Sequence, residues 1–137
     1  MEKKVGTLVE LFDRRNLPNV VGVQAFSPEN VVYIADKKAC SKRKIESTEK
    51  FFKVMGIGTK VHWRLVDMSD FEAVYAEIKG SVEKFGVEAI DVTGGRAYSY
   101  IAAGLICKEK GVQAIYYEFK KNEFSDVFSG EVIEAGR

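Results

Sequence analysis

At 137 residues the chain has the length of one domain, long enough to bury a core without disulfides or bound metals. Its 21 lysine and arginine residues nearly balance 20 aspartate and glutamate residues. The resulting net charge of +1 argues against a protein that coats duplex nucleic acid through charge alone. A hydrophobic share of 46% is ordinary for a globular protein, and no apolar run approaches the roughly 20 residues of a transmembrane helix.

The first residues and the two cysteines indicate where the protein works. Met1 to Lys4 is charged and is not followed by an apolar segment, so we expect no signal peptide. Cys40 and Cys107 lie far apart in the sequence without metal-ligand spacing, as is usual for reduced thiols in the cytoplasm. We therefore expect one soluble domain over residues 1–137, in the cytoplasm and without contact to membranes.

Strand and helix patterns alternate along the whole chain. In order, they predict a strand over 7–12, a helix over 19–26, a strand over 31–35, a helix between 41 and 56, a strand over 61–66, a helix between 69 and 86, a strand over 89–92, a helix between 97 and 111, a strand over 113–119 and a short strand near 131–133.

Capping residues support the helix boundaries. Ser41 is an N-cap candidate, and Ser69-x-x-Glu72 matches a capping box. Gly86 and Gly111 stand where two helices end. In the helix from residue 97, we expect one apolar stripe that contains Ile101, Leu105 and Ile106, with small residues among them.

This alternation predicts an α/β fold, a Rossmann-like open sheet of about five to six mostly parallel strands with helices on both faces. Ligands of such sheets bind outside the carboxyl ends of the strands. Three loops that follow predicted strands therefore qualify as site loops: residues 13–19, 36–44 and 93–98.

The turn Thr93-Gly94-Gly95 is the strongest local signal. It joins a buried strand to a helix, and free N–H groups at a helix N-terminus form an anion or phosphate site. The spacing matches neither the dinucleotide fingerprint nor the P-loop. A tight strand–helix turn without a ligand remains the alternative.

Cationic residues surround these loops. Five lie within eight positions, Lys37, Lys38, Lys42, Arg43 and Lys44, and they suit either a phosphate-bearing ligand or a solvated helix face. Arg96 follows the two glycines and opposes the helix dipole, which a bound anion would compensate.

The residues do not assemble a recognised catalytic or metal site. His62, the only histidine, alternates with Trp63 in a predicted strand, so we expect it to pack rather than to react. No G-x-S-x-G elbow and no metal-ligand spacing occur, and we expect no cofactor. Whether Asp36 and Asp91 approach each other for acid–base chemistry stays open at this point.

Four segments in this order resemble the CARF domain (CRISPR-associated Rossmann fold), in the branch usually fused to a PD-(D/E)xK nuclease: Leu8-Val-Glu-Leu-Phe-Asp13, Leu17-Pro-Asn-Val20, Phe26-Ser-Pro-Glu-Asn-Val-Val-Tyr33 and Asp91-Val-Thr-Gly-Gly95. The likeness covers nearly the whole chain. It departs from the family at Arg96-Ala97, where the family commonly has Thr-Lys. No nuclease motif of that branch fits in the remaining residues.

The resemblance implies a sensor of cyclic oligoadenylate in type III CRISPR antiviral signalling, and we expect cyclic tetra-adenylate as its ligand. It also implies a homodimer, because a two-fold-symmetric ring suits a two-fold dimer. The ligand-binding residues expected from the loops and the resemblance are Asp13, Arg14, Asn16, Asn19, Asp36, Lys37, Lys38, Thr93, Gly94, Gly95, Arg96 and Ser99.

Two alternatives to the sensor function remain open. One is a metal-independent ring nuclease, in which a ribose 2′-OH attacks the next phosphate with help from Arg96 or Lys37. The other is a ligand-free dimerisation or scaffold domain. An effector nuclease domain, separate from or removed from this chain, is the further partner that the resemblance implies.

Overall fold

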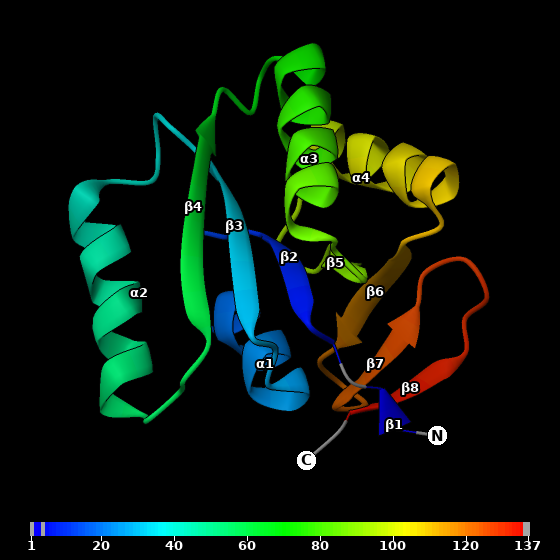
Figure 1. Cartoon of the computed structure of the whole chain (residues 1–137), viewed down its shortest axis with the longest axis horizontal. Helices are drawn as coiled ribbons and strands as arrows, with labels where there is room; N and C mark the ends of the chain where they lie inside the picture. Colours follow the sequence, from blue (N-terminus) through cyan, green and yellow to red (C-terminus); the bar gives the residue numbers. More distant parts are fainter. Residues whose placement is uncertain (1, 4, 136–137) are drawn as a thin grey trace.

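A single eight-stranded sheet forms the centre of the structure, a computed structural model that describes residues 2–3 and 5–135 (Figure 1). Its strands are β1 (Glu2–Lys3), β2 (Thr7–Leu11), β3 (Asn30–Asp36), β4 (Lys60–Val66), β5 (Ala89–Asp91), β6 (Gln113–Glu118), β7 (Glu123–Asp126) and β8 (Val132–Ala135). The helices are α1 (Leu17–Phe26), α2 (Lys42–Val54), α3 (Phe71–Phe85) and α4 (Ala97–Lys110).

The strand order is β1-β8-β7-β6-β5-β2-β3-β4, and the five strands from β6 to β4 pair in parallel. The predicted Rossmann-like, mostly parallel sheet is therefore confirmed. The predicted number of five to six strands is too low, because β1 and β7 were not anticipated. β7 contains a single apolar residue, Phe124, and β1 has only two residues, so neither carries a clear alternating pattern. β7 also introduces the antiparallel pairs β6–β7 and β7–β8.

Helices cover both faces of the sheet, as expected. On one face, Val23 and Phe26 of α1 and Phe52 of α2 pack with Leu8 and Tyr33 of the sheet. On the other face, residues of α3 and α4 pack against sheet residues that alternate with the first set, including Val9, Leu11, Val32 and Ile34. The alternation places successive side chains of each strand in two different cores, because both faces are buried.

Most predicted helix ends are confirmed. Ser41 accepts a hydrogen bond from the Lys44 N–H at 3.2 Å, and Gly86 and Gly111 close α3 and α4 in the left-handed conformation. The capping box at Ser69 is wrong. Asp70 is the N-cap of α3, whereas Ser69 donates to Asp67 within the preceding turn.

The predicted apolar stripe of α4 is also wrong. Ile101 and Leu105 are 55% and 47% exposed. The buried face consists of Ser99, Ala102, Ala103, Ile106 and Cys107, which also follow helical spacing. Small residues form most of the buried face because they allow the helix to pack close to the sheet. The larger side chains then lie on the exposed side.

Candidate functional site

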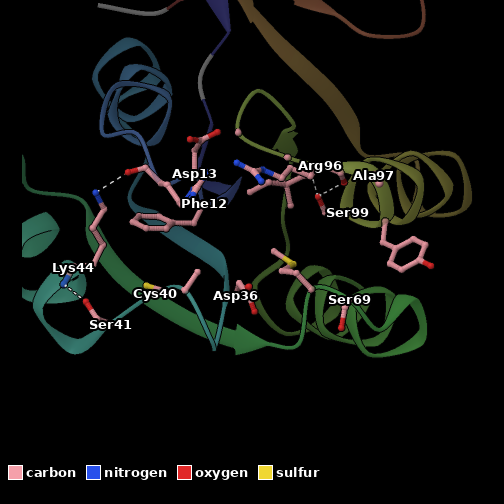
Figure 2. A pocket seen from close by; sticks show the side chains of 17 residues that line it. Phe12, Asp13, Asp36, Cys40, Ser41, Lys44, Ser69, Arg96, Ala97 and Ser99 are labelled. Atoms are coloured by element: carbon pink, nitrogen blue, oxygen red, sulfur yellow. Dashed lines mark hydrogen bonds between the residues drawn. The ribbon is translucent and has the colours of Figure 1, made fainter.

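The three predicted site loops meet at one edge of the sheet, around a cavity of about 580 Å³ (Figure 2). β2, β3 and β5 are parallel, so their carboxyl ends lie at this edge together. Seven of the twelve predicted residues line the cavity: Asp13, Arg14, Asp36, Gly94, Gly95, Arg96 and Ser99. The rule that ligands bind outside the carboxyl ends of parallel strands, here called the strand-end rule, therefore located the cavity from the sequence.

The loop between β2 and α1 is held by the amide of Asn19. Its side chain accepts from the Asp13 N–H at 2.6 Å and donates to the carbonyls of Asp13 and Arg15 at 2.8 and 2.9 Å. Asn19 is buried and does not line the cavity. It shapes the loop from below and leaves Asp13 and Arg14 facing the cavity.

Gly94 and Gly95 bring the second loop against the first. Neither adopts the left-handed backbone conformation. A Cβ on Gly94 would stand 2.4 Å from the carbonyl oxygen of Leu11, and one on Gly95 would stand 2.6 Å from the Leu11 side chain. Glycine is required at position 94 because the turn touches the backbone at Leu11 and Asp13, whereas at position 95 an added Cβ would have to displace the Leu11 side chain.

The first turn of α4 is closed by Ser99. Its hydroxyl accepts from the Arg96 N–H at 2.8 Å and donates to the Arg96 carbonyl at 2.7 Å (Figure 2). Thr93 lies below the cavity rather than in its lining. Its hydroxyl donates to Asp91 Oδ1 and accepts from the Tyr117 N–H at 2.9 Å, so the side chain ties the turn to β5 and β6.

Three cationic side chains from three separate segments line the cavity: Arg14 from the loop after β2, Lys44 from the first turn of α2 and Arg96 from the N-cap of α4. The Lys44 ammonium donates to the Arg14 carbonyl at 2.9 Å and to Asn16 Oδ1 at 2.7 Å, which joins the start of α2 to the first loop. Asn16 thus stands behind Lys44, outside the lining.

The basic run after β3 divides into two parts. Lys44 reaches the cavity, whereas Lys37 and Lys38 do not line it. Lys38 pairs instead with Asp67 at 3.6 Å, and both lysines are exposed. The helical turn of α2 decides this division, because it places Lys44 one turn above its N-cap on the side of the cavity.

Asp13 supplies an internal carboxylate to this cationic site. Its Oδ1 accepts from the Arg15 backbone N–H at 2.8 Å and from Arg15 Nε at 3.2 Å. Burial on its own would raise the pKa of Asp13, but the hydrogen bonds and charge of Arg15, with the charge of Arg96, lower it below the usual value. Asp13 therefore carries its charge at neutral pH and balances part of the positive charge around it.

The list of expected ligand-binding residues left out part of the lining, although several of these residues lie in the predicted site loops. The remaining residues are Leu11, Phe12, Ala39, Cys40, Ser41, Met68, Ser69, Ala97 and Tyr98, together with Lys44, which lay in the basic run but was not selected. Met68 and Ser69 follow β4, the neighbour of β3. Applying the strand-end rule to this fourth strand would have found them.

His62 and Asp91, two candidates for acid–base chemistry, lie outside the lining of the cavity. His62 lies away from the cavity, where its Nε2 contacts Asn30 Oδ1 at 3.0 Å and its ring packs on Phe85. Asp36 lines the cavity but Asp91 does not, so the two do not form an acid–base pair there. Among the described residues, no group of three or more histidine, cysteine, aspartate or glutamate side chains is placed to hold a metal.

No helix within the described ranges is long and apolar enough to cross a membrane.

Comparison with known proteins finds similarity in structure but not in sequence families. No family model and no curated protein matches the chain. Can2 from Sulfobacillus thermosulfidooxidans, solved in complex with cyclic tetra-adenylate, superposes with a TM-score of 0.81 at 20% identity over 95% of this chain and 37% of Can2. Protein VC1899 from Vibrio cholerae gives a TM-score of 0.76 at 11% identity over 94% of this chain and 35% of its own length.

A third solved structure is a type III CRISPR defence DNA nuclease activated by cyclic oligoadenylate. It gives a TM-score of 0.69 at 17% identity and covers 100% of this chain and 24% of the nuclease. The chain thus spans 24–37% of these three proteins. The resemblance to CARF domains that the sequence motifs indicated is thereby confirmed for the fold.

Proposed function

We propose that this chain is a sensor domain that binds cyclic oligoadenylate, with cyclic tetra-adenylate as the first candidate, in type III CRISPR antiviral signalling. The observation that carries the proposal is the cavity itself. It joins the Gly94-Gly95 turn with Arg14, Lys44 and Arg96 at the carboxyl edge of a parallel sheet. Cations held on separate segments of the chain suit a ligand with several phosphates, and the α4 N-terminus favours an anion.

Can2 and the CRISPR defence nuclease support the choice of ligand, because they share this fold, Can2 was solved in complex with cyclic tetra-adenylate, and the nuclease is activated by cyclic oligoadenylate. The aromatic and apolar lining, including Phe12, Met68 and Tyr98, suits the faces of adenine bases. We propose that the protein acts in the cytoplasm and that its effector lies outside these 137 residues.

We further propose that the sensor is a homodimer joined through α4. Tyr98 lines the cavity and is 45% exposed, and the exposed Ile101 and Leu105 continue the same helical face. A second copy on this face would bring two cavities beside one two-fold axis. Each subunit would then hold half of a two-fold-symmetric ring.

Calorimetric titration of the protein at moderate salt, with rings of four and six adenylates and with linear tetra-adenylate, tests the function. We expect binding of the four-membered ring at micromolar concentration or tighter. Arg96→Ala and Lys44→Ala should each weaken it about 10- to 100-fold, since each removes a charge-assisted contact of about 1.5–3 kcal/mol. Lys50→Ala, an exposed lysine of α2 outside the cavity, is the matched control and should bind normally.

The absence of heat with every ring would exclude the sensor and leave the scaffold alternative. Chromatography of the ligand after long incubation decides the ring-nuclease alternative, because recovery of intact rings excludes cleavage. Binding that is unchanged in Arg96→Ala and Lys44→Ala would show that the ligand occupies another place.

A further inference from the structure

Two acidic side chains lie side by side in the core, directly beneath the site. Glu10 of β2 and Asp91 of β5 are register partners on neighbouring strands, and neither has any exposed surface. Both point to Gly22 of α1. A Cβ on Gly22 would stand 2.5 Å from Glu10 Oε2 and 2.9 Å from Asp91 Oδ2, so the two carboxyl groups converge on one point.

If both side chains were ionised, most of their oxygens would have no hydrogen-bond donor. Within the described part of the chain, both oxygens of Glu10 and Oδ2 of Asp91 have no hydrogen-bond partner. The two groups can bond to each other only if one of them carries a proton. Burial, then the charge of Asp91 and the hydrogen bond to it, raises the pKa of Glu10 well above its usual value. Burial also raises the pKa of Asp91, against hydrogen bonds from Glu10 and Thr93 that lower it.

The described residues around the pair offer no counter-charge. α1 contains no ionisable side chain. On β3, the register partner of Glu10 is Tyr33, whose phenol donates to the Asn19 carbonyl at 2.5 Å, and burial raises the pKa of that phenol. On the side of β6, the neighbours are Ile115 and the Tyr117 N–H, which is bonded to Thr93. Among the described residues, no lysine, arginine or histidine pairs with either acid.

The pair is coupled to the cavity through Asp91. Its Oδ1 accepts from the Thr93 N–H at 3.0 Å and from the Thr93 hydroxyl. Thr93 leads directly into Gly94, Gly95 and Arg96, which line the cavity. Any movement of the Asp91 carboxylate therefore changes the two hydrogen bonds that hold Thr93, at the start of the Thr93-Gly94-Gly95 turn.

We propose that Glu10 and Asp91 hold one proton between them, with Glu10 as the acid that donates to Asp91, and that this proton fixes the turn 92–95 at the floor of the cavity. The two acids are positioning residues and do not contact the ligand. Removal of the proton leaves two buried carboxylates with no counter-charge, which repel each other and strain the bonds to Thr93. This inference concerns the protein alone and holds whichever ligand the cavity takes.

The sign of the pH dependence follows from the raised pKa of Glu10. The folded state keeps a proton that the unfolded chain releases near the ordinary glutamate value of about 4.3. The stability due to this proton is complete below that value and is lost as the pH rises through the folded pKa. In this window the unfolding equilibrium constant should increase up to about tenfold per pH unit.

The test combines two measurements on the ligand-free protein. Urea unfolding between pH 5.5 and 8.5 should show this increase in the wild type and a flatter dependence in Glu10→Gln, a neutral isostere that keeps a donor for Asp91. Glu46→Gln, which removes an exposed carboxyl of α2, should keep the wild-type dependence. In wild-type NMR spectra, the Glu10 carboxyl carbon should titrate well above the ordinary glutamate value, together with the backbone amides of Thr93 to Arg96.

In Glu10→Gln, those amides should no longer titrate. If the two acids had only a structural role, the turn amides would not be expected to follow the Glu10 titration. The proposal is overturned if the Glu10 carboxyl titrates at the ordinary glutamate value, or if it titrates at higher pH while the chemical shifts of the turn amides do not change. Because the carboxyl is observed in the wild type, the test stands even if Glu10→Gln fails to fold. Neither measurement involves cyclic oligoadenylate, so failure here is separate from failure of the proposed function.

Discussion

Gly94 lies against Asp13, and this contact joins the two loops at the floor of the cavity. A Cβ on Gly94 would stand 2.9 Å from the Cβ of Asp13 and 2.4 Å from the carbonyl oxygen of Leu11. These are backbone and near-backbone atoms, which cannot move aside as the end of a flexible side chain can.

Gly94→Ala should therefore destabilise the protein by about 1–3 kcal/mol, as overpacking does. Pushing the loops apart should also weaken ligand binding at the cavity. Urea denaturation measures the first effect and calorimetry the second. Gly80→Ala is the control: this exposed glycine inside α3 has no atom within 4 Å of an added Cβ, and the change should stabilise by about 0.5–1 kcal/mol. Equal effects of the two substitutions would contradict the close loop contact.

Ser99→Ala should uncap α4 at the edge of the cavity. It removes the N3 hydroxyl that accepts from the N–H of the N-cap residue Arg96 and donates to its carbonyl, and loss of such a hydrogen bond costs about 0.5–1.5 kcal/mol. Thermal or urea unfolding measures the loss. Ser47→Ala, an exposed position inside α2, should stay within about 0.5 kcal/mol of the wild type. A Ser99→Ala protein as stable as this control would mean that the cap is dispensable.

Asp13→Asn should change the response to acid. The lowered pKa of Asp13 means that its carboxylate contributes stability above the unfolded value of about 3.9, and this stability is lost as the pH falls through the folded pKa. The wild type should thus lose more stability than Asp13→Asn between pH 5 and 2.5, in urea denaturation at each pH. Glu46→Gln should follow the wild type. An identical acid response of Asp13→Asn and the wild type would show that Arg15 does not stabilise the charged form.

Ile101→Asp should disrupt the proposed dimer without unfolding the subunit. Ile101 is already exposed in the single chain, so a charge costs the monomer little, whereas it would be buried in an α4 interface. Light scattering coupled to gel filtration should show a dimer for the wild type and a monomer for the variant. Val54→Asp, at an exposed apolar position on α2, should remain dimeric. A wild-type monomer at micromolar concentration, with and without ligand, would refute the dimer.

Much of the site could be predicted from the sequence because the rule behind it is local. A strand that ends in polar residues before a helix identifies its own exit loop, and this placed Asp13, Asp36 and Arg96 around the cavity. The same rule could not separate residues within a loop. Asn19 and Thr93 were expected to bind the ligand, but their polar groups bond to the backbone and to Asp91 below the cavity.

The pattern in α4 shows a second limit. Ile101 and Leu105 on the exposed side and Ala102 and Ile106 on the buried side both repeat at helical spacing. Hydrophobicity favours burial of the larger residues, but the distance between helix and sheet decides which face fits, and that distance is a property of the assembled fold.

The sequence by itself determined the succession of strands and helices, the caps at Ser41, Gly86 and Gly111, and the resemblance to CARF domains. Periodicity and caps act within a few residues, so they can be recognised without knowing the fold. Only the tertiary structure decided that Lys44 rather than Lys38 reaches the cavity, and that Gly94 is needed to let two loops touch. It alone brought Glu10 beside Asp91, because strand order joins residues 81 positions apart and burial turns two ordinary acids into a pair that needs a proton.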